Sequence, residues 1–292
     1  MIYLTEFLQV VIGGVKIGAI YSLAAIGLVV IHKATKTVNF AHGAFIMLGA
    51  YAGYFGLKFL PYSLVYLLVP IAIGLIAGGI ESGVLRSLRR ADHFSVVIST
   101  VFLGIAIVEL VRVVYESEML SVSPVLVGRP WIIADVVLSR ETIWIGLGAL
   151  TASAIAVYVF MRLAIGRGMR AMASNPRGAQ LCGYSVDWIY GIAWFFGGAL
   201  AGLAGLFAAP PMGVSPELAL ATLVPAFVAA VIGGFDSLIG ALLGGIILGI
   251  VETLSAAYIS SAMKGAVTFM LLFAMLLFRP EGLFPEVKRR SA

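Results

Sequence analysis

Arg162-Leu-Ala-Ile-Gly-Arg-Gly-Met-Arg-Ala-Met-Ala-Ser-Asn-Pro-Arg-Gly-Ala-Gln-Leu-Cys-Gly-Tyr-Ser-Val-Asp187 is a polar stretch that lies between long apolar runs. Its residues also predict a compact shape. Residues 170–173 favour helix, Asn175 suits the position before a helix, Pro176 suits the first helical position, and Gly183 can end the turn that follows. The stretch therefore predicts two short helical pieces with a bend between them.

Composition places the rest of the chain in the membrane. Hydrophobic residues make up 61% of the 292 residues and charged residues only 11%, whereas soluble domains carry about 25% charged residues. The apolar stretches approach the roughly 20 residues that a helix needs to cross hydrocarbon, and they lack the alternation typical of barrel strands. We predict an all-α, polytopic helical integral membrane protein.

Length and helix-breaking residues divide the chain into nine candidate spans. The short interval Phe235-Asp236-Ser237 separates the seventh from the eighth, which predicts either two spans with a tight turn or one interrupted helical region; we favour two spans. The expected number of membrane segments is about eight to nine. The candidates are residues 8–31, 41–58, 64–81, 94–114, 142–161, 189–209, 219–235, 238–258 and 264–278.

Basic residues predict the orientation of these spans, because short basic loops stay on the cytoplasmic side. An outside N-terminus puts 13 of the 19 basic residues in cytoplasmic segments. The stretch 162–187 is then cytoplasmic, and the alternative interpretation is that it is only an ordinary topogenic loop. The 13 residues are Lys33, Lys36, Arg86, Arg89, Arg90, Arg162, Arg167, Arg170, Arg177, Arg279, Lys288, Arg289 and Arg290; Lys58, Arg129, Arg140 and Lys264 fall outside, and Lys16 and Arg112 lie within spans.

Asn39 and His42 are polar residues at the start of an otherwise apolar span. Asn39 can cap the helix and His42 can bond to a neighbouring helix, or the two residues can line a pathway or gate. His32 and His93 form no ligand cluster with His42, so we predict no metal site.

Glu109 and Glu252 lie inside apolar runs and must face protein, water or a partner. We treat them as candidates for a polar interior. A proton relay is the functional hypothesis, and pairing with Lys16 or Arg112 is the structural one.

Catalytic motifs and basic soluble domains are both missing from the sequence. No lysine follows a glycine, so the Gly-Lys of a phosphate-binding loop is absent. We therefore predict no ATPase or other enzyme activity, no catalytic residues and no cofactor. The net charge of +5 is explained by membrane topology and does not indicate nucleic-acid binding.

Small residues spaced four apart predict close packing between the spans. The pairs are Gly14 and Gly18, Gly49 and Gly53, Gly74 and Gly78, Gly198 and Gly202, Gly240 and Gly244, and Gly245 and Gly249.

Several short motifs, in the same order from about residue 8 to residue 284, resemble the permeases of branched-chain amino acid ABC importers. The chain is most similar to the shorter of the two permeases that pair in that system. The resemblance implies a single permease domain over residues 1–292 with the ABC importer permease fold. The motifs are Asn39-Phe-Ala-His-Gly43, Leu48-Gly-Ala-Tyr51, Gly166-Arg-Gly-Met-Arg-Ala171, Gly183, Val231-Ile-Gly-Gly234 and Arg279-Pro-Glu-Gly-Leu283.

The resemblance also implies partners. A second, related permease would complete a heterodimeric channel in the bacterial inner membrane, a periplasmic binding protein would deliver solute, and two cytoplasmic ATPase subunits would drive transport. Segment 162–188 would dock on an ATPase subunit. The residues that match the family's coupling segment are Arg167, Arg170, Ala171, Asn175, Pro176 and Gly183.

Leucine, isoleucine and valine are the solutes that the resemblance favours, and urea, short amides or other small solutes are alternatives within the same class. An ion-coupled secondary transporter and a structural scaffold are rival classes. The chain departs from several relatives because neither Ser174 nor Asn175 is acidic. Docking would then depend on shape, backbone and arginine contacts.

Overall fold

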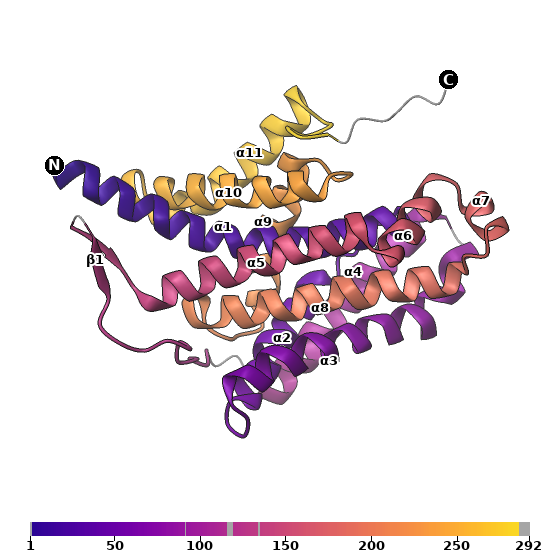
Figure 1. The fold of residues 1–292 in the computed structure, drawn as a ribbon, viewed down its shortest axis with the longest axis horizontal. Helices are drawn as coiled ribbons and strands as arrows, with labels where there is room; N and C mark the ends of the chain where they lie inside the picture. The colour runs from indigo at the N-terminus through magenta and orange to yellow at the C-terminus, as the bar shows by residue number, and fades with distance from the viewer. Residues whose placement is uncertain (1, 91, 116–118, 134, 286–292) are drawn as a thin grey trace.

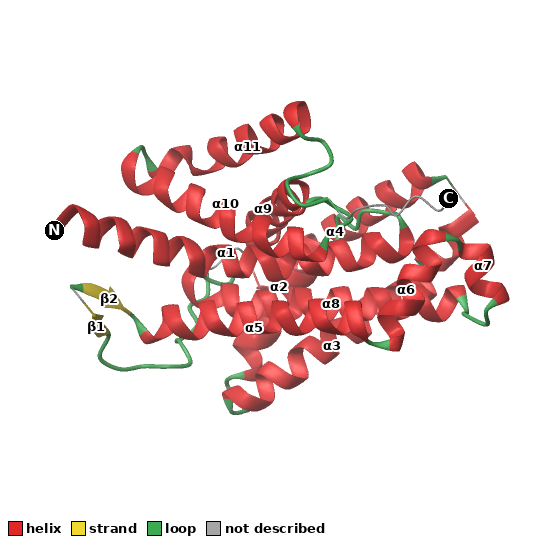
Figure 2. Ribbon diagram, turned by 45° about the horizontal axis from the view of Figure 1, so that its top comes forward, coloured by secondary structure: helices red, strands yellow, loops and turns green. Residues whose placement is uncertain are grey.

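The computed structural model describes residues 2–90, 92–115, 119–133 and 135–285, which form a helical bundle with one small sheet (Figures 1 and 2). The helices are α1 (Ile2–Thr35), α2 (His42–Gly56), α3 (Tyr62–Gly83), η1 (Leu85–Arg90), α4 (His93–Tyr115), α5 (Arg140–Arg162), α6 (Ala164–Ser174), α7 (Pro176–Leu181), α8 (Val186–Met212), α9 (Leu218–Gly233), α10 (Leu238–Tyr258), η2 (Ser261–Met263) and α11 (Lys264–Phe278). The strands β1 (Trp131–Ile133) and β2 (Val136–Leu138) pair antiparallel in a segment for which the sequence predicted nothing.

Each of the nine predicted spans corresponds to one of these helices, which confirms the all-α membrane fold. Seven described spans are long and apolar enough to cross a membrane, the last of them formed by η2 and α11 together; α2, with 15 residues, and α9, with 16, are shorter. The predicted number of eight to nine is therefore approximate. The sequence favoured two spans at 219–258, and the structure has two separate helices there, of which α9 is shorter than a full span. Between them Ser237 donates its N–H to the Gly234 carbonyl at 2.9 Å and caps α10 by accepting from the Gly240 N–H.

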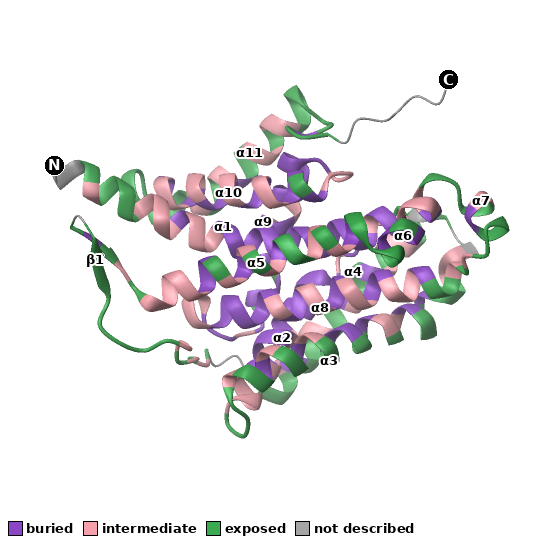
Figure 3. Ribbon diagram, in the orientation of Figure 1, coloured by how far each residue is buried: buried purple, intermediate pink, exposed green. Residues whose placement is uncertain are grey.

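Helix α1 is the centre of the bundle (Figure 3). In its apolar window 83% of the residues are buried, against 6% in the window of α11. Two of the predicted small-residue pairs meet here: Gly14 and Gly18 of α1 face Gly245 and Gly249 of α10. Between helices in lipid, where hydrophobic driving force is absent, such close backbone approach supplies the packing energy.

The chain between α1 and α2 is not helical although it lies inside the bundle. Ala41 lies against Gly104, near the middle of α4, and the Phe40 N–H donates to the Thr100 hydroxyl at 3.1 Å. The Phe40 ring stacks on Phe227 of α9 at 6.0 Å. Irregular backbone is tolerated at this depth because protein encloses it. The predicted span 41–58 agrees with α2 to within two residues at each end, and the residues just before it enter the bundle without helical structure.

The basic segments gather at one end of the bundle, where α6 and α7 lie in Figure 1. Lys33 lies over the Phe160 ring at the end of α5, and Lys36 pairs with Asp236 at 3.3 Å. Burial alone would raise the pKa of the Asp236 carboxyl, but the neighbouring Lys36 ammonium holds that pKa below its usual value. The grouping agrees with the predicted charge distribution; Lys288, Arg289 and Arg290 lie outside the described residues.

The α1–α10 contact predicts the effect of one methyl group. A Cβ at residue 249 would lie 2.3 Å from the N and Cα atoms of Gly18, so we expect Gly249→Ala to destabilise the protein by about 1–3 kcal/mol. The measurement is thermal unfolding in detergent. Gly79→Ala in α3 is the control, because nothing lies within 4 Å of its added Cβ. Equal melting temperatures for the two variants would contradict the close α1–α10 contact.

Candidate coupling site

The segment that joins α5 to α8 folds as its sequence predicts, into the short helices α6 and α7 with a bend between them. Asn175 is the N-cap of α7 and accepts from the Gly178 N–H at 3.0 Å, and Pro176 occupies the first helical position. After α7, Gly183 has φ +88°, a value that favours glycine. The Tyr184 N–H then donates to the Ala179 carbonyl at 3.0 Å and closes the turn.

Two arginines fasten α6 to the end of α5. Arg170 donates to the carbonyls of Phe160 and Met161, and its guanidinium lies 5.6 Å from the centre of the Phe160 ring. Arg167 donates to the Arg162 carbonyl at 3.1 Å. These carbonyls lack intrahelical partners because α5 ends there, so the arginines cap it. Sequence reasoning proposed Arg167 and Arg170 as contacts for another protein, and the structure gives both an internal role.

Gly166 allows α6 to lie directly on the end of α5. A Cβ at this position would lie 1.8 Å from the carbonyl oxygen of Phe160 and 2.5 Å from its carbon. Backbone cannot yield as a flexible side chain can, so no larger residue fits this contact without moving α6. Gly166, part of the quoted motif, thus fixes the entry of the segment.

An ion-pair network holds the other end of the segment. Asp187, in the first turn of α8, pairs with Arg86 and Arg89 of η1. Arg89 also donates its Nε–H to Glu81 of α3 at 2.9 Å, and the Glu81 side chain is only 3% exposed. Removing one member of such a buried pair costs several kcal/mol, about 3–5. Sequence analysis missed this network. The sequence did contain a signal for it: Asp187 is the one acid of the stretch 162–187, and that stretch was predicted on the same side of the membrane as the basic residues of 86–90.

The middle of the segment is exposed. Asn175, Pro176 and Arg177 lie on the surface, Leu181 is 91% exposed, and the single cysteine, Cys182, is exposed and free. Ala171 is half-buried on α6, behind this tip. The arrangement is an exposed tip held rigidly at both ends.

Asn39 and His42 are fully enclosed in this chain. The Asn39 side-chain oxygen accepts from the Ala41 N–H at 2.9 Å, and His42 Nε2 lies 2.9 Å from the Ala24 carbonyl oxygen of α1. The His42 contact matches the structural alternative of a bond to a neighbouring helix. The predicted cap is wrong, because the N-cap of α2 is Ala41, and Asn39 closes the turn before the helix instead. Asn39 Nδ2 and His42 Nδ1 are buried and find no hydrogen-bond partner among the described residues. A gating role for this pair stays a prediction.

The two acids predicted for a polar interior are placed differently from each other. Glu252 is 1% exposed and binds the Tyr21 hydroxyl at 3.0 Å, the Thr268 hydroxyl, and Lys264 at 3.4 Å. Sequence analysis suggested Lys16 or Arg112 as the partner of this carboxylate, and neither residue pairs with it. Lys264 takes that place because α11 packs beside α10.

Glu109 lies on an exposed face of α4 and not in the interior of this chain. It pairs with Arg112 at 2.7 Å, the i,i+3 spacing of one helix face, and Arg112 reaches Glu217 before α9 at 3.4 Å. Lys16 pairs with Glu141 at 3.6 Å. Arg112 is thus a structural partner of Glu109, as one of the alternatives proposed.

Residues 10–276 match the protein family described as branched-chain amino acid transport system, permease component. The chain is 31% identical to the high-affinity branched-chain amino acid transport system permease protein LivH of Salmonella typhimurium and 32% identical to LivH of Escherichia coli K12, each over 97% of both chains. It is 26% identical to a probable branched-chain amino acid transport permease protein LivH of Methanocaldococcus jannaschii, over 89% of this chain and 87% of the relative. No solved structure matches the chain.

The contact between Gly166 and Phe160 predicts how the segment responds to a small change. We expect Gly166→Ala to push α6 off the end of α5 and to speed tryptic cleavage between Arg162 and Arg177 at least about fivefold, because strain of 1–3 kcal/mol raises the open population that the protease attacks. The measurement is limited trypsinolysis in detergent. The control is Gly146→Ala in α5, whose added Cβ meets nothing within 4 Å; equal cleavage rates would refute the anchoring.

Proposed function

This chain belongs to the family of branched-chain amino acid transport permeases, and we propose that it forms part of the translocation pathway of an ATP-driven importer for leucine, isoleucine and valine. The observation that carries the proposal is the coupling segment, residues 162–188, whose exposed α7 tip is anchored at both ends. Alternating access needs such a rigid connection, because a motor outside the membrane acts on helices inside it.

The motor would be two cytoplasmic ATPase subunits, since this chain lacks the Gly-Lys of a phosphate-binding loop. Leu181 and Arg177 at the tip would enter a groove of an ATPase subunit. Asn175 would act by shaping α7, because its side-chain oxygen is already bound to the Gly178 N–H. Without an acid at residues 174 and 175, this docking would rely on shape and on Arg177.

The second permease would cover α4. In the apolar window of this helix only 17% of the residues are buried, and its exposed face carries Glu109 and the adjoining Arg112. Charged side chains at membrane depth face protein or water and avoid lipid. A related permease on this face, with the pathway between the two chains, would satisfy them. The chain would lie in the bacterial inner membrane. A periplasmic binding protein would deliver solute at the end of the bundle opposite α7.

Two features bear on the rival functions. Glu252 already binds Tyr21, Thr268 and Lys264, which favours a structural role over a proton relay and so argues against an ion-coupled secondary transporter. The names of the relatives favour branched-chain amino acids over urea or short amides.

Reconstitution separates these possibilities. The chain, its second permease and the ATPase subunits are placed in vesicles, with binding protein outside. We expect labelled leucine to enter only with ATP inside and binding protein present, and excess unlabelled valine to compete while excess urea does not. The matched control carries an ATPase subunit whose phosphate-loop lysine is replaced. Uptake that persists in this control, or that follows an ion gradient, would overturn the proposal.

A further inference from the structure

Charged side chains of both signs meet on the exposed face of α4. Arg112 Nη1 lies 2.7 Å from Glu109 on the same helix, and Arg112 Nη2 lies 3.4 Å from Glu217, the residue before α9. These three residues are called the outer charge cluster below. Their side chains are 40%, 52% and 60% exposed, so a small solute can reach them. Exposed ion pairs contribute little to stability, and a charged solute can therefore replace them at low cost.

The outer charge cluster lies at the end of the bundle opposite α7. Helix α8 starts beside α7 and runs for 27 residues, about 40 Å, before the chain reaches Ser215 and Glu217. Val214 exchanges two backbone hydrogen bonds of 2.9 Å with Leu120, which ties this turn to the chain that follows α4. The cluster is therefore placed at the end where a binding protein would release solute.

Aromatic rings border the cluster on the side of α2. Tyr115, one turn after Arg112, stacks on Tyr51 with 5.3 Å between ring centres, and the Phe55 ring lies 5.0 Å from Tyr115. Tyr51 is 3% exposed, and its hydroxyl finds no hydrogen-bond partner among the described residues. This tyrosine is close enough to Glu217 for the two to interact electrostatically. A buried hydroxyl without a partner thus lies beside the charged groups.

Acids outnumber bases in the cluster. Hydrogen bonds from its own N–H and from the Ser215 hydroxyl hold the pKa of the Glu217 carboxyl below its usual value, so Glu217 is ionised at neutral pH. Arg112 is shared between Glu217 and Glu109. A ligand that carries both charges suits this set, because its carboxylate can replace a glutamate on Arg112 while its ammonium pairs with the glutamate that is released.

We propose that the outer charge cluster binds the head group of an amino acid, with the α-carboxylate on Arg112 and the α-ammonium on Glu109 and Glu217. The guanidinium can bind a carboxylate through two parallel hydrogen bonds. The ring of Tyr115, which is 40% exposed, offers apolar surface to an aliphatic side chain. The inference rests on the proposed function, since the amino acid would come from the binding protein and enter the pathway beside α4.

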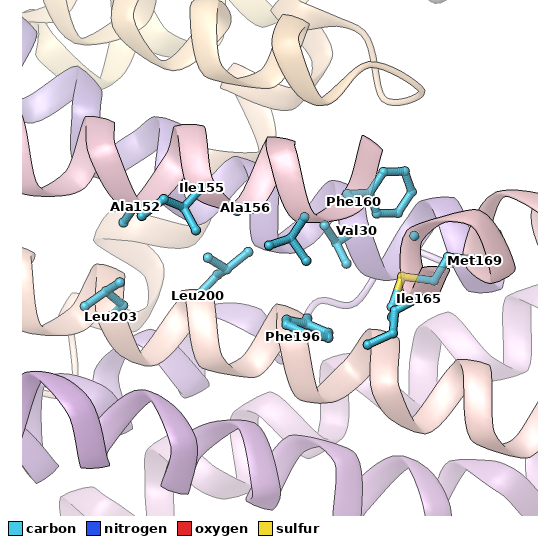
Figure 4. Close-up of a pocket in the computed structure, with 12 residues that line it drawn as sticks. Val30, Ala152, Ile155, Ala156, Phe160, Ile165, Met169, Phe196, Leu200 and Leu203 are labelled. Atoms are coloured by element: carbon cyan, nitrogen blue, oxygen red, sulfur yellow. The ribbon is translucent and has the colours of Figure 1, made fainter. Parts of the chain in front are cut away.

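Other ligands match the cluster less well. A metal cation or a lone ammonium would meet the Arg112 guanidinium, and an anion alone would meet two carboxylates. Urea and short amides carry no formal charge to pair with either. The cavity of about 260 Å³ between α5 and α8 (Figure 4) is lined by apolar residues such as Phe196 and Leu200, and would leave both charged groups of an amino acid unpaired.

The test measures leucine binding to the complex of this chain, its second permease and the ATPase subunits, without binding protein, by saturation-transfer NMR. Leucinamide, which lacks the carboxylate, and 4-methylpentanoate, which lacks the ammonium, separate the two charges. We expect leucine to bind at least about fivefold more tightly than either analogue, because each analogue loses one charged pair. Equal binding of the three ligands would overturn the proposal.

Charge-matched variants locate the site. Arg112→Gln should weaken the binding of leucine and 4-methylpentanoate and should not weaken that of leucinamide. Glu217→Gln should weaken leucine and leucinamide and should not weaken 4-methylpentanoate. The control is Arg129→Gln, at an exposed position whose carbonyl is bonded to Arg140 at the start of α5, and it should change none of the three. Unchanged leucine binding in both cluster variants would refute the site.

Two further readouts separate the possible failures. Loss of the second permease when either cluster variant is purified would show that the cluster is a subunit contact, and the proposal would be wrong. ATP-driven leucine uptake by a complex whose leucine binding ignores both variants would overturn the site and leave the proposed function standing. Charge-dependent leucine binding by a complex that shows no ATP-driven uptake would count against the proposed function alone.

Discussion

The close approach of α1 to α10 through facing glycines is the contact on which the rest of the bundle depends. In lipid, helices associate through packing and internal hydrogen bonds, since lipid tails are as apolar as the side chains. Helix α1 satisfies this constraint by being enclosed: α10 packs on its glycine face, and α5, α8 and α9 pack around it. Both helices that flank segment 162–188, α5 and α8, also pack on α1.

Segment 162–188 is fastened at each end to a different part of the bundle. Arg167, Arg170 and Gly166 join α6 to the end of α5. Asp187 joins the start of α8 to η1 and, through Arg89, to the buried Glu81 of α3.

Much of this architecture was predictable from the sequence, for local reasons. Apolar runs of membrane length located the helices, and the Asn175-Pro176 cap and Gly183 located the bend, because each signal depends on a few adjacent residues. The break before α2 was predicted as well, because the candidate spans end at residue 31 and resume at residue 41; the contacts of this stretch with α4 and α9 were not, since they depend on packing between distant helices. The pairing of Glu252 with Lys264 was missed because it depends on how α10 and α11 pack. The bonds of Arg170 to the carbonyls of Phe160 and Met161 were not predictable, because they depend on how α6 packs on the end of α5.

The most direct test of the central claim, that the α7 tip is where an ATPase subunit docks, uses the chain's own cysteine. Cys182 is exposed beside Leu181 and is the one cysteine of the sequence. A membrane-impermeant maleimide should label it in inside-out vesicles freed of ATPase subunits, and should fail to label it in right-side-out vesicles or once the subunits are added back. Labelling from the outer side, or labelling at an unchanged rate with the subunits bound, would contradict the account.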